Sequence, residues 1–154
     1  MKLKHSISEK ITLNRERVWL FEFTQDITQR QIWDKQTLEI GFLEGDAVLQ
    51  KGARVYTKSR EGIRMDTEYL TFETPIEISI RMMNHSSIFK DFIGTWKYHP
   101  TASNTTTLEI TYEFNLRFPY RIFSSIVSKK VRKNVLQKLH FLESHLSKME
   151  IAAK

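Results

Sequence analysis

The sequence has 154 residues, of which 40% are hydrophobic and 27% charged, and its formal net charge is +6. This composition excludes a disordered chain, and no apolar run approaches the roughly 20 residues that a membrane span requires. The absence of cysteine excludes disulfides, thiolate metal sites and cysteine nucleophiles and suits the reducing cytosol, so we expect a cytoplasmic protein. Residues 1–10 contain charges and a histidine but no apolar core, so a secretory signal is not expected.

The N-terminal part of the chain predicts one strand followed by two short helices. Residues 5–13 alternate imperfectly, but they favour an extended conformation. Asn14 is a good N-cap for a first helix, and Asp26 or Thr28 could cap a second one that ends at about Trp33.

The middle of the chain predicts six further strands. Apolar and polar residues alternate most clearly in residues 76–82 and 107–116. Glu61-Gly62 indicates a tight hairpin, and residues 100–104 are predicted to form a polar turn. Because most connections are short, the strands should form an antiparallel sheet. The six strands are expected at residues 37–43, 53–59, 63–72, 76–82, 89–98 and 107–116.

The last part of the chain has a helical period instead. Apolar residues from Phe123 to Leu146 recur every three or four positions, and Pro119 suits the first turn of a helix. This predicts one helix from about Tyr120 to Lys148, roughly 40 Å long at about 1.5 Å per residue. A sheet with alternating residues has one buried face, which this helix should cover.

The positive charge is concentrated in residues 117–138, which contain seven basic residues and no acidic one. Such a segment can contact nucleic acid, an anionic membrane or an acidic protein, but it is also typical of a solvated helix face. Nucleic acid is not expected, because recognition motifs and exposed aromatic platforms are missing. A transient contact with an acidic protein or an anionic membrane would use Lys129, Lys130, Arg132 and Lys133.

A twisted sheet around one helix need not close along its whole length, and the gap would form a cavity. Ligand pockets are mostly apolar with a few orienting polar groups, here Thr67, Tyr69, Tyr98 and Tyr112. The alternative is that the inward side chains simply fill the core, since the sequence pattern is the same in both cases. The candidate lining residues are Trp33, Phe42, Met65, Tyr69, Met82, Phe92, Trp96, Tyr112, Phe123 and Val127.

The titratable residues form no recognisable catalytic or metal-binding pattern. The five histidines lack the spacing of metal ligands, so we expect neither a metal nor another cofactor. His85, in a predicted turn, and His99, at a strand end, could reach the mouth of a pocket and act as a general base, although such histidines are usually exposed. Catalytic residues therefore stay unassigned.

Short motifs occur in a distinctive order, namely residues 11–19, Asp26 with Ile32-Trp33-Asp34, Gly52-Ala53-Arg54-Val55, residues 94–98 and Phe118-Pro119. In this order, over about residues 5–148, they resemble the START-like helix-grip superfamily, also called SRPBCC, and within it the polyketide cyclase/dehydrase and lipid transport branch. The chain departs from that pattern at two loops. It has Asp34-Lys35 where a proline is frequent, and Thr74-Pro75-Ile76 where two prolines are common.

The resemblance implies an α+β helix-grip fold in a single domain of residues 1–154. A curved antiparallel sheet of about seven strands would surround a long C-terminal helix, with two short helices after the first strand. It also implies binding of a hydrophobic or amphipathic small molecule, such as a lipid or a polyketide-like compound, in an internal cavity. It supplies no activity, because the superfamily includes carriers, sensors, cyclases and co-chaperone-like members.

We favour a non-catalytic carrier or sensor and leave open whether the protein is an enzyme. The alternatives are a cyclase/dehydrase-type enzyme that acts on an aromatic or polyketide substrate, and a co-chaperone-like protein-interaction module.

Overall fold

The computed structural model describes residues 3–43 and 45–153. The chain begins with strand β1 (His5–Leu13) and helices α1 (Arg17–Gln25) and α2 (Ile27–Trp33), and it ends with a 3₁₀ turn, η1 (Tyr120–Phe123), and helix α3 (Ser124–Ala153). Between them lie β2 (Thr37–Phe42), β3 (Arg54–Ser59), β4 (Arg64–Glu73), β5 (Glu77–Met82), β6 (Phe89–Ala102) and β7 (Thr105–Leu116).

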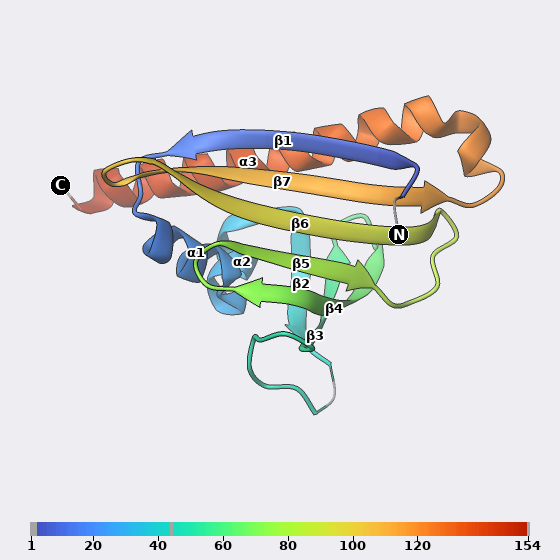
Figure 1. Cartoon of the computed structure of the whole chain (residues 1–154), viewed down its shortest axis with the longest axis horizontal. Coiled ribbons are helices and arrows are strands. Elements are labelled where there is room, and N and C mark those ends of the chain that lie inside the picture. Colours follow the sequence, from blue (N-terminus) through green and yellow to red (C-terminus); the bar gives the residue numbers. More distant parts are fainter. Residues whose placement is uncertain (1–2, 44, 154) are drawn as a thin grey trace.

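The seven strands form one antiparallel sheet in the order β1-β7-β6-β5-β4-β3-β2. Figure 1 shows α3 running lengthwise along the sheet beside β1 and β7, while α1 and α2 lie together at one end. This arrangement confirms the predicted helix-grip architecture. In the described ranges, no helix is long and apolar enough to cross a membrane.

The starts of the two short helices differ in how well the sequence predicted them. Glu16, not Asn14, caps α1, and its carboxylate accepts hydrogen bonds from two backbone N–H groups of the first turn. The prediction of Asn14 was wrong because Arg15 N donates to the Leu13 carbonyl at 2.9 Å, so the chain turns once before the helix begins. Asp26 caps α2 as expected, and its carboxylate accepts from a backbone N–H of that helix.

The predicted turn at residues 100–104 is shorter in the structure. Strand β6 continues to Ala102, and only Ser103 and Asn104 connect it to β7, with Asn104 at a φ of 58°. Pro100 is tolerated in the strand because β5 pairs with β6 only as far as Lys97. Tyr98 N donates to the Ile76 carbonyl on the β5 side of β6, and the nitrogen of Pro100, two residues later, faces the same side. Because β5 has ended there, the missing N–H of the proline costs no ladder bond.

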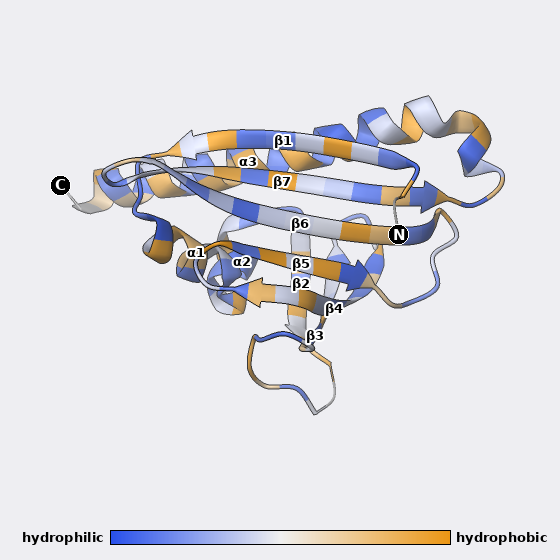
Figure 2. Ribbon diagram, in the orientation of Figure 1, coloured by the Kyte–Doolittle hydropathy of each residue, from blue (hydrophilic) through white to orange (hydrophobic). Residues whose placement is uncertain are grey.

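The core lies between the sheet and α3. Figure 2 shows hydrophobic and hydrophilic residues alternating along several strands, as expected for a sheet with one covered face. The apolar stripe of α3 is buried at Val131, Val135, Leu139, Leu142 and Leu146.

The start of the last helix differs from the prediction. Residues Tyr120–Phe123 form a 3₁₀ turn with three residues per turn, so they do not continue the spacing of the α-helical stripe. Phe123 is therefore 52% exposed and does not face the sheet, which corrects its predicted inward position. Val127, one turn later, packs against a small apolar cluster that contains Val131.

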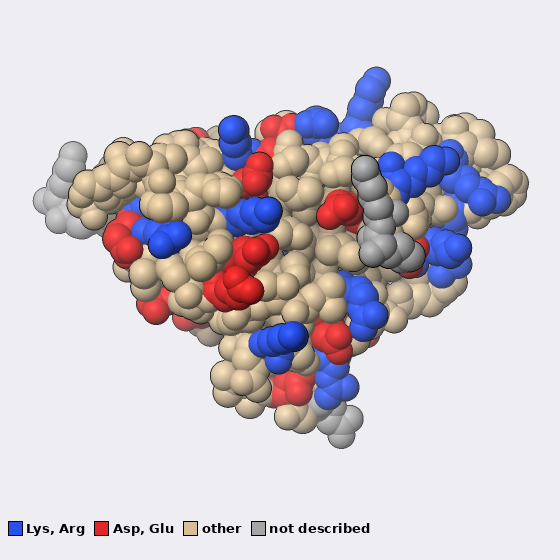
Figure 3. Space-filling model, in the orientation of Figure 1, with Lys and Arg blue, Asp and Glu red and all other residues tan. Residues whose placement is uncertain are grey.

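The predicted basic residues of α3, Lys129, Lys130, Arg132 and Lys133, are exposed. Arg132 pairs with Glu9 on β1, and Lys130 Nζ lies 4.0 Å from Glu61 Oε2. Figure 3 shows basic side chains gathered near the connection between β7 and α3, whereas acidic and basic residues mix over the middle of this face.

The hydroxyl of Tyr98 joins β6 to α1, and we expect Tyr98→Phe to lower the free energy of unfolding by about 1–3 kcal/mol. The buried hydroxyl lies 2.6 Å from Thr24 Oγ1 and accepts a hydrogen bond from Gln25 Nε2 at 2.9 Å. Urea denaturation followed by circular dichroism measures the change. The control is Tyr120→Phe, because Tyr120 is partly exposed on η1. Equal losses in the two variants would contradict this role of the hydroxyl.

Candidate functional site

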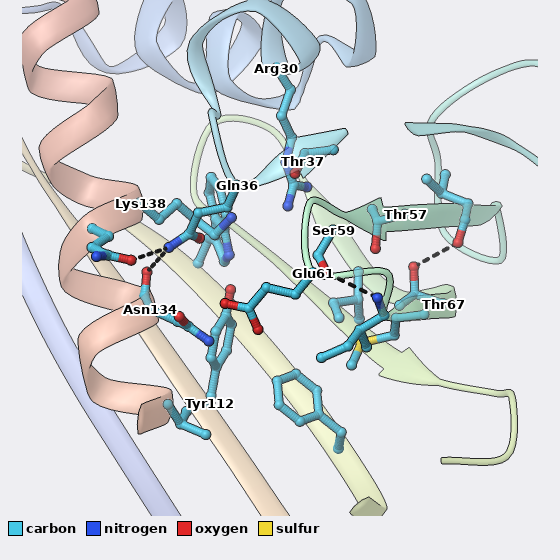
Figure 4. A pocket seen from close by; sticks show the side chains of 18 of the residues that line it. Arg30, Gln36, Thr37, Thr57, Ser59, Glu61, Thr67, Tyr112, Asn134 and Lys138 are labelled. Atoms are coloured by element: carbon cyan, nitrogen blue, oxygen red, sulfur yellow. Dashed lines mark hydrogen bonds between the residues drawn. The ribbon is translucent and has the colours of Figure 1, made fainter. Parts of the chain in front are cut away.

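A cavity of about 410 Å³ lies between the curved sheet and α3. The backbone of α3 approaches β1 and β7, so a space remains between the helix and strands β3 to β6. Apolar residues on the walls include Val55, Ile78, Ile80, Phe92 and Trp96. Thr57 on β3 and Thr67 on β4 are shorter side chains that face the same space (Figure 4).

The mouth of the cavity is formed by three segments that are distant in the sequence. They are the connection between α2 and β2, the turn between β3 and β4, and the middle of α3. On one side, Gln36 Nε2 donates to the carbonyl of Asn134 at 2.9 Å and to Gln137 Oε1 at 3.2 Å (Figure 4). The exposed residues around the mouth are Lys35, Arg60, Glu61, Ile63, Asn134 and Gln137.

A glycine shapes the wall beneath Tyr112. Gly94 on β6 pairs with Tyr112 on β7, and a Cβ atom at Gly94 would lie only 3.0 Å from the tyrosine ring. The missing side chain therefore lets the ring lie against the sheet, where Tyr112 lines the cavity.

A charge cluster, made of buried Asp34, buried Lys138 and half-buried Arg30, lies beside the cavity. Asp34 Oδ2 accepts hydrogen bonds from Lys138 Nζ at 2.6 Å, Thr37 Oγ1 at 3.0 Å and Arg30 Nε at 3.4 Å. The other carboxylate oxygen accepts from the backbone N–H of Gln36 at 3.2 Å. Because these partners come from α2, β2 and α3, the fully buried carboxylate joins all three elements.

In this cluster, the opposite charges of neighbouring side chains offset the cost of burial. Burial alone would raise the pKa of Asp34, but Lys138 and Arg30 outweigh it and lower that pKa to about 2. Burial lowers the pKa of Lys138, although the Asp34 carboxylate opposes this. Burial also disfavours the charge of Arg30, but Asp34 more than compensates and raises the arginine pKa. The cluster therefore pairs one carboxylate with two basic side chains.

Two tyrosines supply neutral polar groups to the cavity. Burial raises the pKa of Tyr69, and it raises the pKa of Tyr112 to about 12, while the nearby positive charge of Arg30 opposes both shifts. Both hydroxyls therefore keep their protons near neutral pH. Tyr98 was expected beside them, but its hydroxyl binds Thr24 and Gln25 outside the cavity lining.

Half of the ten predicted lining residues lie around the cavity, namely Met65, Tyr69, Phe92, Trp96 and Tyr112. Trp33 and Phe42 pack into the main core instead, and Met82 and Val127 pack in the smaller apolar cluster. Phe123 is exposed. Whether any of these residues contacts a ligand stays a prediction.

The predicted general bases lie elsewhere. His85 and His99 are exposed and do not line the cavity, and His99 Nε2 lies 3.4 Å from Glu109 Oε1 on the neighbouring strand. Across residues 3–43 and 45–153, no three His, Asp or Glu side chains gather as metal ligands would.

Arg30 and Lys138 were missed as lining residues, although a signal for Lys138 was present. Lys138 follows Val135 by three positions and precedes Leu142 by four, which places a lysine on the apolar stripe of the helix. A charge on a buried face requires a partner of opposite charge. Asp34, four residues after Arg30, is that partner.

The model of the polyketide cyclase/dehydrase and lipid transport family matches residues 4–146. The chain belongs to this family. No curated protein sequence matches this family member. Its place in the family agrees with the resemblance carried by the sequence motifs.

Solved structures show the same fold. The di-domain ARO/CYC BexL from the BE-7585A biosynthetic pathway has a TM-score of 0.79 at 11% identity, over 94% of this chain and 47% of that one. A START superfamily protein from Mycobacterium smegmatis has a TM-score of 0.72 at 11% identity, over 93% and 99%. An HSP90 activator from Plasmodium falciparum has a TM-score of 0.68 at 15% identity, over 92% and 96%. This family member thus has the START-like helix-grip fold that the sequence predicts.

Proposed function

We propose that this protein binds a small hydrophobic or amphipathic molecule in the cavity, as a non-catalytic carrier or sensor in the cytosol. The observation that carries this proposal is the cavity itself, whose volume of about 410 Å³ lies in the range of ligand pockets. Membership in the polyketide cyclase/dehydrase and lipid transport family also supports a hydrophobic or amphipathic ligand.

A non-catalytic role is supported by the state of the titratable groups. Lys138 and Arg30 form ion pairs with Asp34, and the tyrosine hydroxyls of the cavity keep their protons, so neither tyrosine is poised as a base near neutral pH. A carrier or sensor must bind its ligand and let it enter. The apolar walls can supply the binding affinity, and the exposed rim can supply the entrance.

A cyclase/dehydrase-type activity is the second candidate. It is supported by Arg30, Lys138 and Tyr112, which place hydrogen-bond donors at the wall of an otherwise apolar cavity. Such donors could stabilise the charge that develops on a carbonyl oxygen of an aromatic or polyketide substrate.

Contact of Lys129, Lys130, Arg132 and Lys133 with an acidic protein or an anionic membrane stays a separate prediction.

Titration with N-phenyl-1-naphthylamine, an uncharged probe that fluoresces in apolar surroundings, tests ligand binding. We expect saturable binding of one probe per chain. Thr57→Trp places a large ring in the cavity near its mouth and should weaken binding at least about tenfold, because the ring occupies space that the probe needs.

Lys58→Trp is the matched control for this titration. Lys58 is adjacent to Thr57 on β3, and successive strand residues point to opposite faces, so this ring lies outside the cavity. Its affinity for the probe should stay within about twofold of the wild type. Absence of saturable binding, or equal affinities in the two tryptophan variants, would overturn the proposal.

A further inference from the structure

We propose that the cavity selects amphipathic acids, whose carboxylate lies against Arg30 and Lys138 while the apolar body contacts the aromatic walls. This inference rests on the ligand-binding function proposed above and names the chemical class of its ligand.

The charges around the cavity do not balance. In the buried cluster, one carboxylate, Asp34, faces two cations, Arg30 and Lys138. A charge that is largely removed from water and has no partner is unfavourable, so a surplus positive charge on half-buried Arg30 beside an apolar space favours an anion.

The residues around the mouth of the cavity also carry a net positive charge. Lys35 and Arg60 add two further positive charges, and among the described lining residues Glu61 is the single acid. Glu61 lies 4.0 Å from Lys130 on α3, so its charge is shared with a residue outside the cavity. A negatively charged ligand would therefore approach and enter through a rim that attracts it.

Arg30 has donors available for such a ligand. Its Nε is directed at Asp34 at 3.4 Å, and in the described part of the chain its two terminal nitrogens have no hydrogen-bond partner. Its guanidinium lies 5.3 Å from the centre of the Trp96 ring. One face of the guanidinium is thus supported by an aromatic wall, while its terminal N–H groups can form the paired bonds that carboxylates prefer.

Lys138 supplies the second cation. Its ammonium group has three N–H donors, and within the described residues Asp34 accepts from it. Figure 4 shows Arg30 extending from α2 and Lys138 from α3 towards the same part of the cavity. A carboxylate placed there would complete a group of two cations and two anions.

The rest of the cavity suits the apolar part of the ligand. Phe92 and Trp96 provide aromatic walls, and Ile78 and Ile80 provide aliphatic ones. Tyr69 and Tyr112 add neutral hydroxyls rather than negative charges. One polar end with surplus positive charge and one apolar body is the pattern expected for an aromatic or aliphatic acid.

The test compares two probes of nearly equal shape, naphthalene-2-carboxylate and naphthalene-2-carboxamide, by isothermal titration calorimetry at pH 7. The wild-type protein should bind the carboxylate at least about tenfold more tightly, because a charge-assisted paired bond exceeds a neutral one. The preference should persist at physiological salt, since buried charge pairs are weakly screened.

Arg30→Gln should reduce this preference to about twofold or less, because it removes the surplus charge and leaves the Asp34–Lys138 pair intact. Its affinity for the carboxamide should change little. Lys133→Gln is the control, since it removes a positive charge from an exposed position on α3 outside the cavity lining, and it should keep the wild-type preference.

The outcomes separate this inference from the proposed function. If the wild-type protein binds N-phenyl-1-naphthylamine or the carboxamide but does not prefer the carboxylate, the anion site is wrong and the cavity remains a ligand site. If Lys133→Gln loses the preference as much as Arg30→Gln does, the preference comes from the overall surface charge and the inference is overturned. If none of the three probes binds, the proposed function itself fails. The wild-type comparison decides the question even if Arg30→Gln does not fold.

Discussion

Asp34→Asn should lower the free energy of unfolding by about 3 kcal/mol, because it leaves buried Lys138 and half-buried Arg30 beside a neutral amide. The carboxylate also accepts bonds from Thr37 Oγ1 and the backbone N–H of Gln36. An amide can accept at one oxygen only, so part of this network is lost together with the charge. Urea denaturation at pH 7 measures the loss.

Asp66→Asn is the control for this substitution. Asp66 pairs with Arg64 at 2.9 Å near the surface, where an ion pair contributes less than about 1 kcal/mol. Equal losses from the two substitutions would show that the buried cluster has no special role in stability.

The difference between the wild type and Asp34→Asn should depend on pH. The pKa of Asp34 is about 2 in the folded protein, below its ordinary value of 3.8. Its stabilising contribution is therefore complete above about pH 5 and disappears as the pH falls through 3.8 towards about 2. The free-energy difference should shrink over this range, because a protonated carboxyl resembles an amide. A difference that stays constant from neutral pH to about pH 2 would contradict the assigned pKa.

Leu142→Ala should also lower the free energy of unfolding by about 3 kcal/mol. Leu142 is fully buried on the face of α3 that covers the sheet, so its truncation removes apolar contacts and leaves a void in the core. Leu136→Ala, at a 47% exposed position of the same helix, should change the free energy by less than about 0.5 kcal/mol. Thermal and urea denaturation of both variants measure the contrast. Similar losses would mean that α3 is not anchored through this stripe.

Much of the fold can be predicted because its main signals are local. The alternation in β5 and β7 and the spacing of Val131, Val135 and Leu139 each reflect the period of one element. Errors arise where a neighbouring element changes the local preference. Pro100 lies inside β6 because β5 has already ended there, and this depends on strand pairing rather than on residue type.

The cavity could be predicted less well than the fold. Inward positions such as Met65, Tyr69 and Tyr112 follow from strand alternation, but alternation does not show which inward residues border an open space. Trp33 and Phe42 face inward and yet fill the core, because the packing of the short helices and of β2 decides where the space remains.

The order of the elements, the buried faces and the family of this protein follow from its residues alone, because periodicity and short motifs are properties of neighbouring residues. The position of the cavity mouth and the charge on the cavity wall, in contrast, depend on how the elements pack in three dimensions. Lys138 lies 104 residues after Asp34, and their contact exists because α3 folds back over the end of α2. Charges that are distant in the sequence interact strongly only when folding brings them together away from water, and here folding leaves one positive charge in excess.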